Sequence, residues 1–360
     1  MKEGRLFSLD VLRGLDMILL TVLGPLVVAA QSSWKCFPDG VMAQFRHGWV
    51  GFTLWDIIMP LFIFMCGAAI PFALGRRLEE GRGVFWRHVL WRVAFLWFMG
   101  GLIQGNWIKL DPNQFTPFSN TLQSIAVGYL TVAVVMSFRS NVLSIVVPVI
   151  LALAYTVILA VGGYEQYGNP AFNVDQVIFK AVLPAANRYV VKPSYYTWFL
   201  TSMMFAFMGF AGYHATRILT SVLSQWRKAV ALAGYGVAML VIGLISEIWI
   251  PCIKPIFTLS FTAQAMGWCA IALAALYVVN DIWLFRKGLA PVLLFGQFAL
   301  TAYFVSHFFA PVLTAGAHLF GDGLLAYLPG SANAFVIKLL FVVQMIAVMI
   351  IWRKVKARRA

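Results

Sequence analysis

The sequence predicts an all-α, polytopic integral membrane protein, a bundle of about 10 transmembrane helices with both termini in the cytoplasm. Its 360 residues are 61% hydrophobic and only 11% charged, with a mean hydropathy of +0.84. That composition leaves too little polar surface for a soluble protein of this length. The apolar residues gather in long runs, and most of the 27 Lys and Arg residues lie between the runs.

Each predicted helix is an apolar run close to the length that a bilayer requires. A spanning helix needs roughly 20 mostly apolar residues. Backbone polar groups in lipid must be satisfied within the segment, and these runs are too long and too continuously apolar for barrel strands. We therefore expect helices at residues 11–30, 50–74, 88–107, 118–138, 142–162, 196–213, 229–250, 256–279, 289–313 and 333–352.

The segments between these helices are short, with one exception. Residues 163–195 form a longer loop rich in Gly and Pro, with a short apolar piece around Val177–Leu183, and could cover an outward-facing site as a lid. The first apolar run is too long for a signal peptide and leads directly into further spans, so we expect it to remain as the first helix. Residues 1–360 are thus predicted to form a single transmembrane domain.

The basic residues predict the orientation. With both termini inside, most Lys and Arg side chains fall in cytoplasmic segments, and His47 falls outside, as the positive-inside rule requires of a multi-pass protein in the plasma (inner) membrane. The formal charge of +14 therefore needs no nucleic acid to explain it. A basic cytoplasmic rim also suits anionic membrane lipids.

The four cysteines indicate no metal chemistry, because none belongs to a metal-ligand or CxxC pattern, so we expect no metal. Cys66 and Cys269 fall inside predicted spans, where a thiol usually acts as a small packing residue. Cys36 and Cys252 both fall in predicted outer loops. A disulfide between them is an open alternative in an oxidising compartment.

His47 and Asp56 form the candidate catalytic pair. Asp56 lies several residues into an otherwise apolar segment, too deep for its short side chain to reach water. His47 lies just upstream, close enough for a turn to bring imidazole and carboxylate together. A carboxylate on one ring nitrogen fixes the tautomer and raises the basicity of the other, which suits a general base. The alternative is a solvated loop histidine.

Further polar residues map to the same outer half of the predicted bundle. Together with His47 and Asp56 they would outline a polar pocket for a substrate. Taken singly, each is more often a hydrogen-bonding contact between helices than a ligand. These residues are Asn106, Gln123, Gln297, Tyr303 and His307.

Charged residues near the inner surface form a second group. Asp10, Arg13 and Asp16 share a helix face at i, i+3 spacing, so either a structural ion-pair cluster or a binding role is open. Arginines are also dense in residues 76–92, where guanidinium groups suit phosphates. The same density is what the positive-inside rule predicts for an inert loop. The arginines concerned are Arg76, Arg77, Arg87 and Arg92.

Several motifs resemble the heparan-α-glucosaminide N-acetyltransferase family. Its members begin with S-x-D-x-x-R-G and continue with a histidine before a W-x-G-x-T-x-x-D-x-x-x-P-x-F-x-F-x-x-G helix. Later come L-Q-R-I-A-x-x-Y and G-x-N-A-L-x-x-Y segments. The similar stretches here, which are spread over nearly the whole chain, are Arg5–Gly14, a loop with His47, Thr53–Gly67, Arg87–Gly101, Thr121–Tyr129, and Phe295–Tyr303 with His307.

The resemblance implies a mechanism. Acetyl-CoA would be the cytoplasmic acyl donor, and the acetyl group would pass to an amino sugar or glycan on the opposite face. His47 would act as general base or as a transient acetyl carrier, and Asp56 would orient it or bind the acceptor. Asp10, Arg13 and the four arginines would recognise the pantetheine and phosphates of CoA.

Two departures from the family pattern leave the acceptor open, together with the choice between N- and O-acetylation. The outer half of the first helix, Leu20–Leu26, lacks an asparagine that the family often has, and Ser124 stands where L-Q-R-I-A has arginine. The competing interpretations are a transporter or flippase for a lipid-linked saccharide, and a non-catalytic component of an envelope polysaccharide system. The absence of an evident inverted repeat disfavours the transporter. A homodimer is left open.

Overall fold

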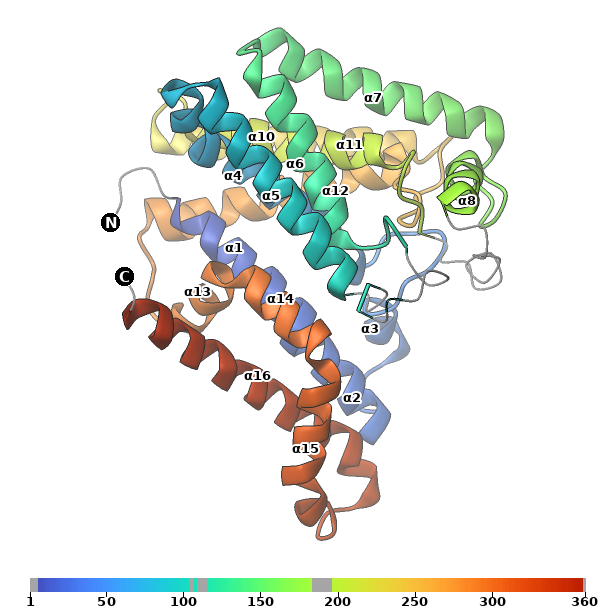
Figure 1. Cartoon of the computed structure of the whole chain (residues 1–360), viewed down its shortest axis with the longest axis vertical. Helices are drawn as coiled ribbons and strands as arrows, with labels where there is room; N and C mark the ends of the chain where they lie inside the picture. Colours follow the sequence, from blue (N-terminus) through green and yellow to red (C-terminus); the bar gives the residue numbers. More distant parts are fainter. Residues whose placement is uncertain (1–5, 104–106, 109, 111–115, 183–195, 359–360) are drawn as a thin grey trace. The chain divides into compact units, whose positions relative to one another are not determined.

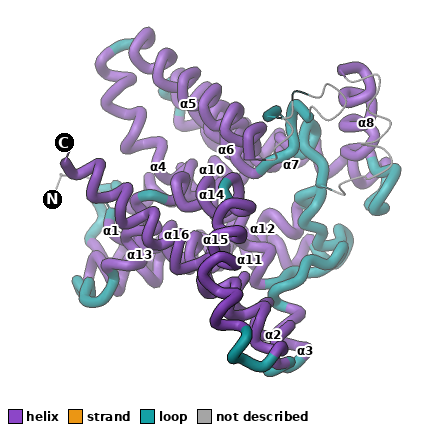
Figure 2. The backbone as a smooth tube through the Cα atoms, turned by 60° about the horizontal axis from the view of Figure 1, so that its bottom comes forward, coloured by secondary structure: helices purple, strands orange, loops and turns teal. Residues whose placement is uncertain are grey.

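The computed structural model describes residues 6–103, 107–108, 110, 116–182 and 196–358. Its described backbone consists of helices joined by loops, without a strand in those ranges (Figure 2). The contacts divide the chain into two compact units, each described by itself. Unit 1 contains residues 48–52 and the described part of 59–283, and unit 2 contains residues 6–47, 53–58 and the described part of 284–360.

Unit 1 is built around one central helix, α10 (Ser202–Leu219), which packs against several others. A fully buried cluster that includes Leu74, Phe85, Tyr129 and Phe210 fills the space between them. The helices α6 and α7 have polar caps. The side chains of Asn120 and Ser140 accept hydrogen bonds from backbone N–H groups in the first turns of α6 and α7. The other helices of the unit (Figure 1) are α4 (Ile58–Glu80), α5 (Arg82–Ile103), α6 (Thr121–Ser137), α7 (Asn141–Gly162), α8 (Pro170–Val182), α11 (Gln225–Ser246) and α12 (Leu259–Tyr277), the last continued by a π-helical turn at Val278–Ile282.

Unit 2 contains the two ends of the chain. α1 packs along α13, and α16 contacts α2, α14 and α15. A π-helical turn, Leu19–Leu23, joins α1 to α2 without a break in the apolar run. The helices of the unit are α1 (Phe7–Ile18), α2 (Gly24–Trp34), α3 (Asp39–Ala43), α13 (Ala290–Gln297), α14 (Ala299–Phe308), α15 (Ala310–Leu325) and α16 (Asn333–Arg358), with short 3₁₀ turns at Leu54–Ile57 and Gly330–Ala332.

Glycines set the contact between α1 and α13. A methyl group at Gly14 would collide with the carbonyl oxygen of Val292, and one at Gly296 would collide with the carbonyl oxygen of Asp10. The two backbones therefore touch directly, which only glycine permits. The Arg-Gly signature that marks the start of the first helix thus has a packing reason.

The structure confirms a helical membrane protein. In the described part of the chain, six helical stretches are long and apolar enough to cross a membrane, and a bent pair, α13 and α14, could be a seventh. α5, α6 and α10 form at three further places where the sequence predicts spans. The six stretches are Phe7–Trp34, Leu54–Glu80, Asn141–Gly162, Gln225–Ser246, Leu259–Ile282 and Gly330–Arg358.

One predicted helix, 289–313, is wrong as a continuous element. The chain leaves the helical conformation at Phe298, where φ is −117° and ψ is 30°, and α13 and α14 meet there at 77°. A second interruption at Phe309 begins α15, which has a proline in its first turn and which the sequence analysis did not predict. The structure also adds α8 within the predicted loop 163–195.

Several predicted helix starts differ from the structure, and the helix expected from residue 88, for example, begins at Arg82. The helix expected from residue 50 begins at Leu54, because Gly51 has φ +110° and Thr53 caps the following turn. The helix expected from residue 196 begins at Ser202. The backbone N–H groups of residues 197–199 instead donate hydrogen bonds outside the helix, to the carbonyl oxygen of Pro255 and the carboxylate of Asp175.

Candidate active site

The candidate site lies in the loop before α4, in unit 2, where a capping box fixes Asp56. The sequence Thr-x-x-Asp places Asp56 at the third position of the turn Leu54–Ile57. Its Oδ2 accepts hydrogen bonds from the backbone N–H of Thr53 at 2.9 Å and from the Thr53 hydroxyl at 2.8 Å. These two bonds fix the orientation of the carboxylate independently of its contact with His47.

The other carboxylate oxygen faces His47. Nδ1 of His47 lies 2.7 Å from Oδ1 of Asp56. The carboxylate is an acceptor, so Nδ1 carries the donated proton and Nε2 of the neutral ring has the lone pair. The Asp56 side chain is 2% exposed, whereas that of His47 is 40% exposed. The arrangement supplies a basic nitrogen that a molecule from outside the protein can reach.

Gln44 and Trp55 hold the two arms of this loop together. The carbonyl oxygen of Gln44 accepts the N–H of Trp55 at 2.9 Å, and its side-chain oxygen accepts the N–H of Leu54 at 3.0 Å. The Trp55 ring packs against Gly24, where a methyl group would collide with it. These contacts bring His47 back beside Asp56 and fix the position of the turn that carries Asp56.

A second histidine–aspartate pair in unit 2 shows what is distinctive about the first. Nδ1 of His318 lies 3.0 Å from Oδ1 of Asp322, one turn apart on α15. Both side chains are more than half exposed. Water screens such a pair and leaves its geometry weakly fixed. The Asp56 carboxylate, by contrast, is buried and held by Thr53, so its contact with His47 has a defined geometry.

The predicted outer-pocket residues are divided between the units. Tyr303 and His307 in unit 2 share one face of α14, with ring centroids 4.3 Å apart and His307 Nδ1 3.0 Å from the Tyr303 carbonyl oxygen. Gln297 is exposed at the end of α13, where the chain bends. Asn106 lies outside the described residues.

Gln123, in unit 1, is fully buried and uses its amide within the protein. Its side-chain oxygen accepts the N–H of Ser119 at 2.8 Å, and its NH₂ group donates to the carbonyl oxygens of Pro117 and Trp97. These bonds connect the loop before α6 to α5. They favour the alternative that the sequence left open, a hydrogen-bonding contact between elements.

The inner charged residues are likewise divided. In unit 2, Arg13 contacts Asp10 at 3.4 Å, and Asp16 is buried on the same helix. In unit 1, Arg76 pairs with Glu80 at 3.1 Å on the exposed end of α4, and Arg77 donates to the carbonyl oxygen of Ala73.

Two further arginines of unit 1 lie on α5. Arg87 is exposed. The Arg92 guanidinium carbon lies 5.0 Å from the centre of the Tyr129 ring, and neither its Nε nor the buried Tyr129 hydroxyl has a hydrogen-bond partner among the residues that the structure describes. That these arginines bind one acetyl-CoA molecule together with Asp10 and Arg13 stays a prediction.

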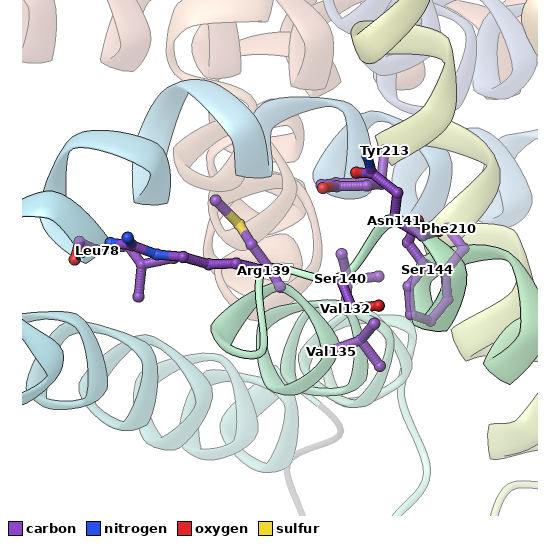
Figure 3. Close-up of a pocket in the computed structure, with 10 residues that line it drawn as sticks. Leu78, Val132, Val135, Arg139, Ser140, Asn141, Ser144, Phe210 and Tyr213 are labelled. Carbon is purple, nitrogen blue, oxygen red and sulfur yellow. Dashed lines mark hydrogen bonds between the residues drawn. The ribbon is translucent and has the colours of Figure 1, made fainter.

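Two cavities in unit 1 are lined by residues outside the predicted site. One, of about 170 Å³, lies where α6 ends and α7 begins (Figure 3). Ser140, Asn141 and Tyr213 line it, and the Arg139 side chain extends away from them to donate to the Leu78 carbonyl oxygen at 3.1 Å. The other is a larger groove along α10.

A buried carboxylate anchors the described part of the 163–195 loop. Asp175 on α8 accepts the backbone N–H groups of Trp198 at 2.7 Å and Phe199 at 3.0 Å. α8 is not among the span helices. Burial raises the pKa of Asp175 to about 7, although the two N–H groups act in the opposite direction.

Sequence reasoning missed several residues that build the candidate site. Thr53 was detectable, since Thr-x-x-Asp before an apolar run is a capping-box signal. Gln44 and Gly24 had no local signal, because their roles depend on contacts with Leu54 and Trp55. Cys36 is exposed and Cys252 is buried, and a disulfide between them stays an open alternative.

Fold and site together define a helical membrane protein with an accessible histidine held by a buried aspartate. Residues 5–184, half of the chain, match the family described as heparan-alpha-glucosaminide N-acetyltransferase, catalytic. The chain belongs to this family, which confirms the resemblance of its motifs, and membership implies acetyltransferase activity. The matched region contains both His47 and Asp56. No curated protein matches the chain.

Proposed function

We propose that the protein is a transmembrane acyltransferase that moves an acetyl group from cytoplasmic acetyl-CoA to an amino or hydroxyl group of an extracytoplasmic sugar or glycan. The observation that carries the proposal is the 2.7 Å contact between His47 and buried Asp56, inside the region that matches the family. The proposal includes about 10 crossings and cytoplasmic termini, which the distribution of basic residues supports.

In the proposed reaction, Nε2 of His47 accepts the proton of the acceptor amine or hydroxyl as that group attacks the thioester carbonyl. A carbon–nitrogen or carbon–oxygen bond forms, the carbon–sulfur bond breaks, and the imidazolium returns its proton to the CoA sulfur. The Asp56 carboxylate stabilises the imidazolium during this exchange. The alternative route places the acetyl group first on Nε2 and then on the acceptor.

Donor recognition is assigned to the inner charged residues. Arginine guanidinium groups match phosphate oxygens in charge and geometry. Arg76 and Arg87 are exposed, which suits contact with a soluble nucleotide. The residues proposed to bind acetyl-CoA are Asp10, Arg13, Arg76, Arg77, Arg87 and Arg92.

Acceptor binding is assigned to polar residues of the predicted outer half. Tyr303 and His307 combine an aromatic face with polar atoms, a combination that can stack on a sugar ring and hydrogen-bond to its hydroxyls. Gln297 is exposed at the bend between α13 and α14. Gln123 is the weakest member of the group, since its amide is already bonded within the protein.

Acetyl transfer by the purified variant His47→Gln tests the proposal. Glutamine keeps a hydrogen-bonding group but has no basic nitrogen, so turnover with acetyl-CoA and a panel of glucosamine-containing acceptors should fall by roughly 10²–10⁴. His318→Gln is the matched control, because it removes a histidine from an exposed pair. Near-normal turnover of His47→Gln, or an equal loss in His318→Gln, would contradict the assignment.

A further inference from the structure

The larger cavity of unit 1 is a groove of about 660 Å³ that the proposed acyl transfer does not use. Its walls come from α7, α10, α11 and α12. Most of the lining side chains are apolar, including Phe207, Met239 and Met266, and none of the described residues that line it is acidic. The groove is therefore suited to a hydrocarbon chain.

The length of the groove matches one leaflet of a bilayer. Along α10 its lining extends from Phe207 to Ile218. At the rise of an α-helix this distance is about 16 Å, roughly half of the hydrocarbon thickness of a membrane. One acyl chain of a membrane lipid would fill the groove along this helix.

One positively charged side chain lies at the end of the groove near the end of α10. Arg217 lies in the last turn of α10, half-buried, with its guanidinium carbon 5.9 Å from the centre of the Tyr213 ring. Ser221 completes the lining at this end. His214, further along the wall, donates from Nε2 to the carbonyl oxygen of Ser144 at 2.8 Å and so belongs to the helix contact. Arg217 is the lining side chain with a permanent charge.

We propose that this groove binds an anionic phospholipid, with one acyl chain along α10 and the lipid phosphate at Arg217. An arginine next to an apolar groove pairs with a headgroup that carries a net negative charge, because a guanidinium forms charge-assisted hydrogen bonds with phosphate oxygens. A zwitterionic lipid fills the same groove but brings its own cation to the arginine. The groove shares no residue with the candidate active site, and the proposal does not depend on the acetyl-transfer proposal.

Native mass spectrometry of the purified full-length protein tests the headgroup contact. Phosphatidylglycerol and phosphatidylcholine with identical acyl chains are supplied in turn, and bound lipid is counted. The wild type should retain phosphatidylglycerol about fivefold better, the preference expected from one basic residue at a membrane surface. Arg217→Gln should reduce this ratio to about one, while Arg227→Gln, which removes an exposed charge from the nearby start of α11, should leave it unchanged.

Filling the groove tests the chain contact independently. Ala231→Trp places a large ring in the lining and should reduce bound phosphatidylglycerol about fivefold or more, whereas Ala238→Trp, on the exposed face of the same helix, should not. Excess glycerol 3-phosphate should not displace the lipid. Equal retention of the two lipids by the wild type, equal losses in the paired variants, or displacement by glycerol 3-phosphate would overturn the proposal.

Discussion

Asp56 is the residue on which the candidate site depends most, because both of its oxygens have assigned partners. Oδ2 is fixed by Thr53, and Oδ1 holds His47. A buried carboxylate with these donors keeps one orientation, so the imidazole beside it keeps one tautomer. The chemistry proposed for His47 is therefore prepared by a residue that does not touch the acceptor.

Asp56→Asn should reduce acetyl transfer by roughly 10²–10⁴, close to the loss expected for His47→Gln. The amide keeps the size of the carboxylate but removes the charge that stabilises the imidazolium. A kcat measurement with purified protein checks this, with Asp322→Asn as the control in the exposed pair. If Asp56→Asn keeps near-wild-type kcat, the charge of Asp56 has no catalytic role.

For single residues, the sequence predicts the contact between His47 and Asp56 better than it predicts the contacts of the other polar residues. The depth of Asp56 in an apolar segment required a polar partner, and His47 lies nine residues upstream, within reach of a turn, so their contact could be anticipated. The bonds of Gln123 could not, since its partners Pro117 and Trp97 are brought to it by the path of the loop before α6. A polar side chain in a membrane span predicts that a hydrogen-bond partner exists. It does not indicate whether that partner belongs to the protein or to a ligand.

The turn that carries Asp56 depends on close packing between Trp55 and Gly24. Gly24→Ala should displace the Trp55 ring, lower the unfolding free energy by about 1–3 kcal/mol and reduce acetyl transfer. Thermal melting and kcat are the measurements. Gly40→Ala is the control, because a methyl group there meets no atom within 4 Å. Equal melting temperatures for the two variants would contradict this packing argument.

The anchor between α8 and the turn before α10 should depend on pH. Asp175 has its pKa raised from 3.8 to about 7 in the folded protein, so between about pH 4 and pH 7 the folded chain keeps a proton that the unfolded chain releases. Stability contributed by this group is therefore present at low pH and lost as the pH rises through about 7, by up to about 4 kcal/mol.

Melting temperature against pH, for the wild type and Asp175→Asn, measures this effect. The asparagine variant should lose most of the decline between pH 4 and pH 7, whereas Asp322→Asn, at an exposed carboxylate, should not. Parallel curves for all three proteins would mean that Asp175 does not titrate as the structure indicates. The readout is stability, so it does not depend on the proposed activity.

Helix positions follow from hydropathy, but helix ends depend on other contacts. The predicted helix 142–162 agrees closely with α7 (Asn141–Gly162), which a side-chain cap at Ser140 begins. The predicted helix 289–313 contains an interruption at Phe298, which the hydropathy of the segment does not reveal. Hydropathy measures how well a segment suits lipid, and a bend inside an apolar run leaves that quantity unchanged.

The orientation of the whole chain is tested by cysteine labelling in intact cells. In a chain whose four cysteines are replaced by serine, a thiol at Arg82 should not react with an impermeant reagent from outside, and a thiol at Val50 should react. Val50 is exposed in the loop that follows His47. Labelling of Arg82→Cys but not Val50→Cys would reverse the proposed topology and move His47 to the cytoplasmic side.

For the whole molecule, composition was sufficient to predict a membrane protein. A chain with a mean hydropathy of +0.84 has too little polar surface to fold in water. The family also followed from motifs that lie at fixed distances along the chain. The groove beside Arg217 could not be found in this way. Its lining comes from four helices, and each of them separately reads as an ordinary apolar span.

The direct backbone contact between α1 and α13 has a consequence for how this sequence can vary. Most core collisions can be relieved by a second substitution that shrinks the neighbouring side chain. At Gly14 and Gly296 the neighbouring atom is a main-chain oxygen, which every amino acid possesses. No second-site change can make room, so a search for suppressors of Gly14→Ala should recover little besides the reversion to glycine.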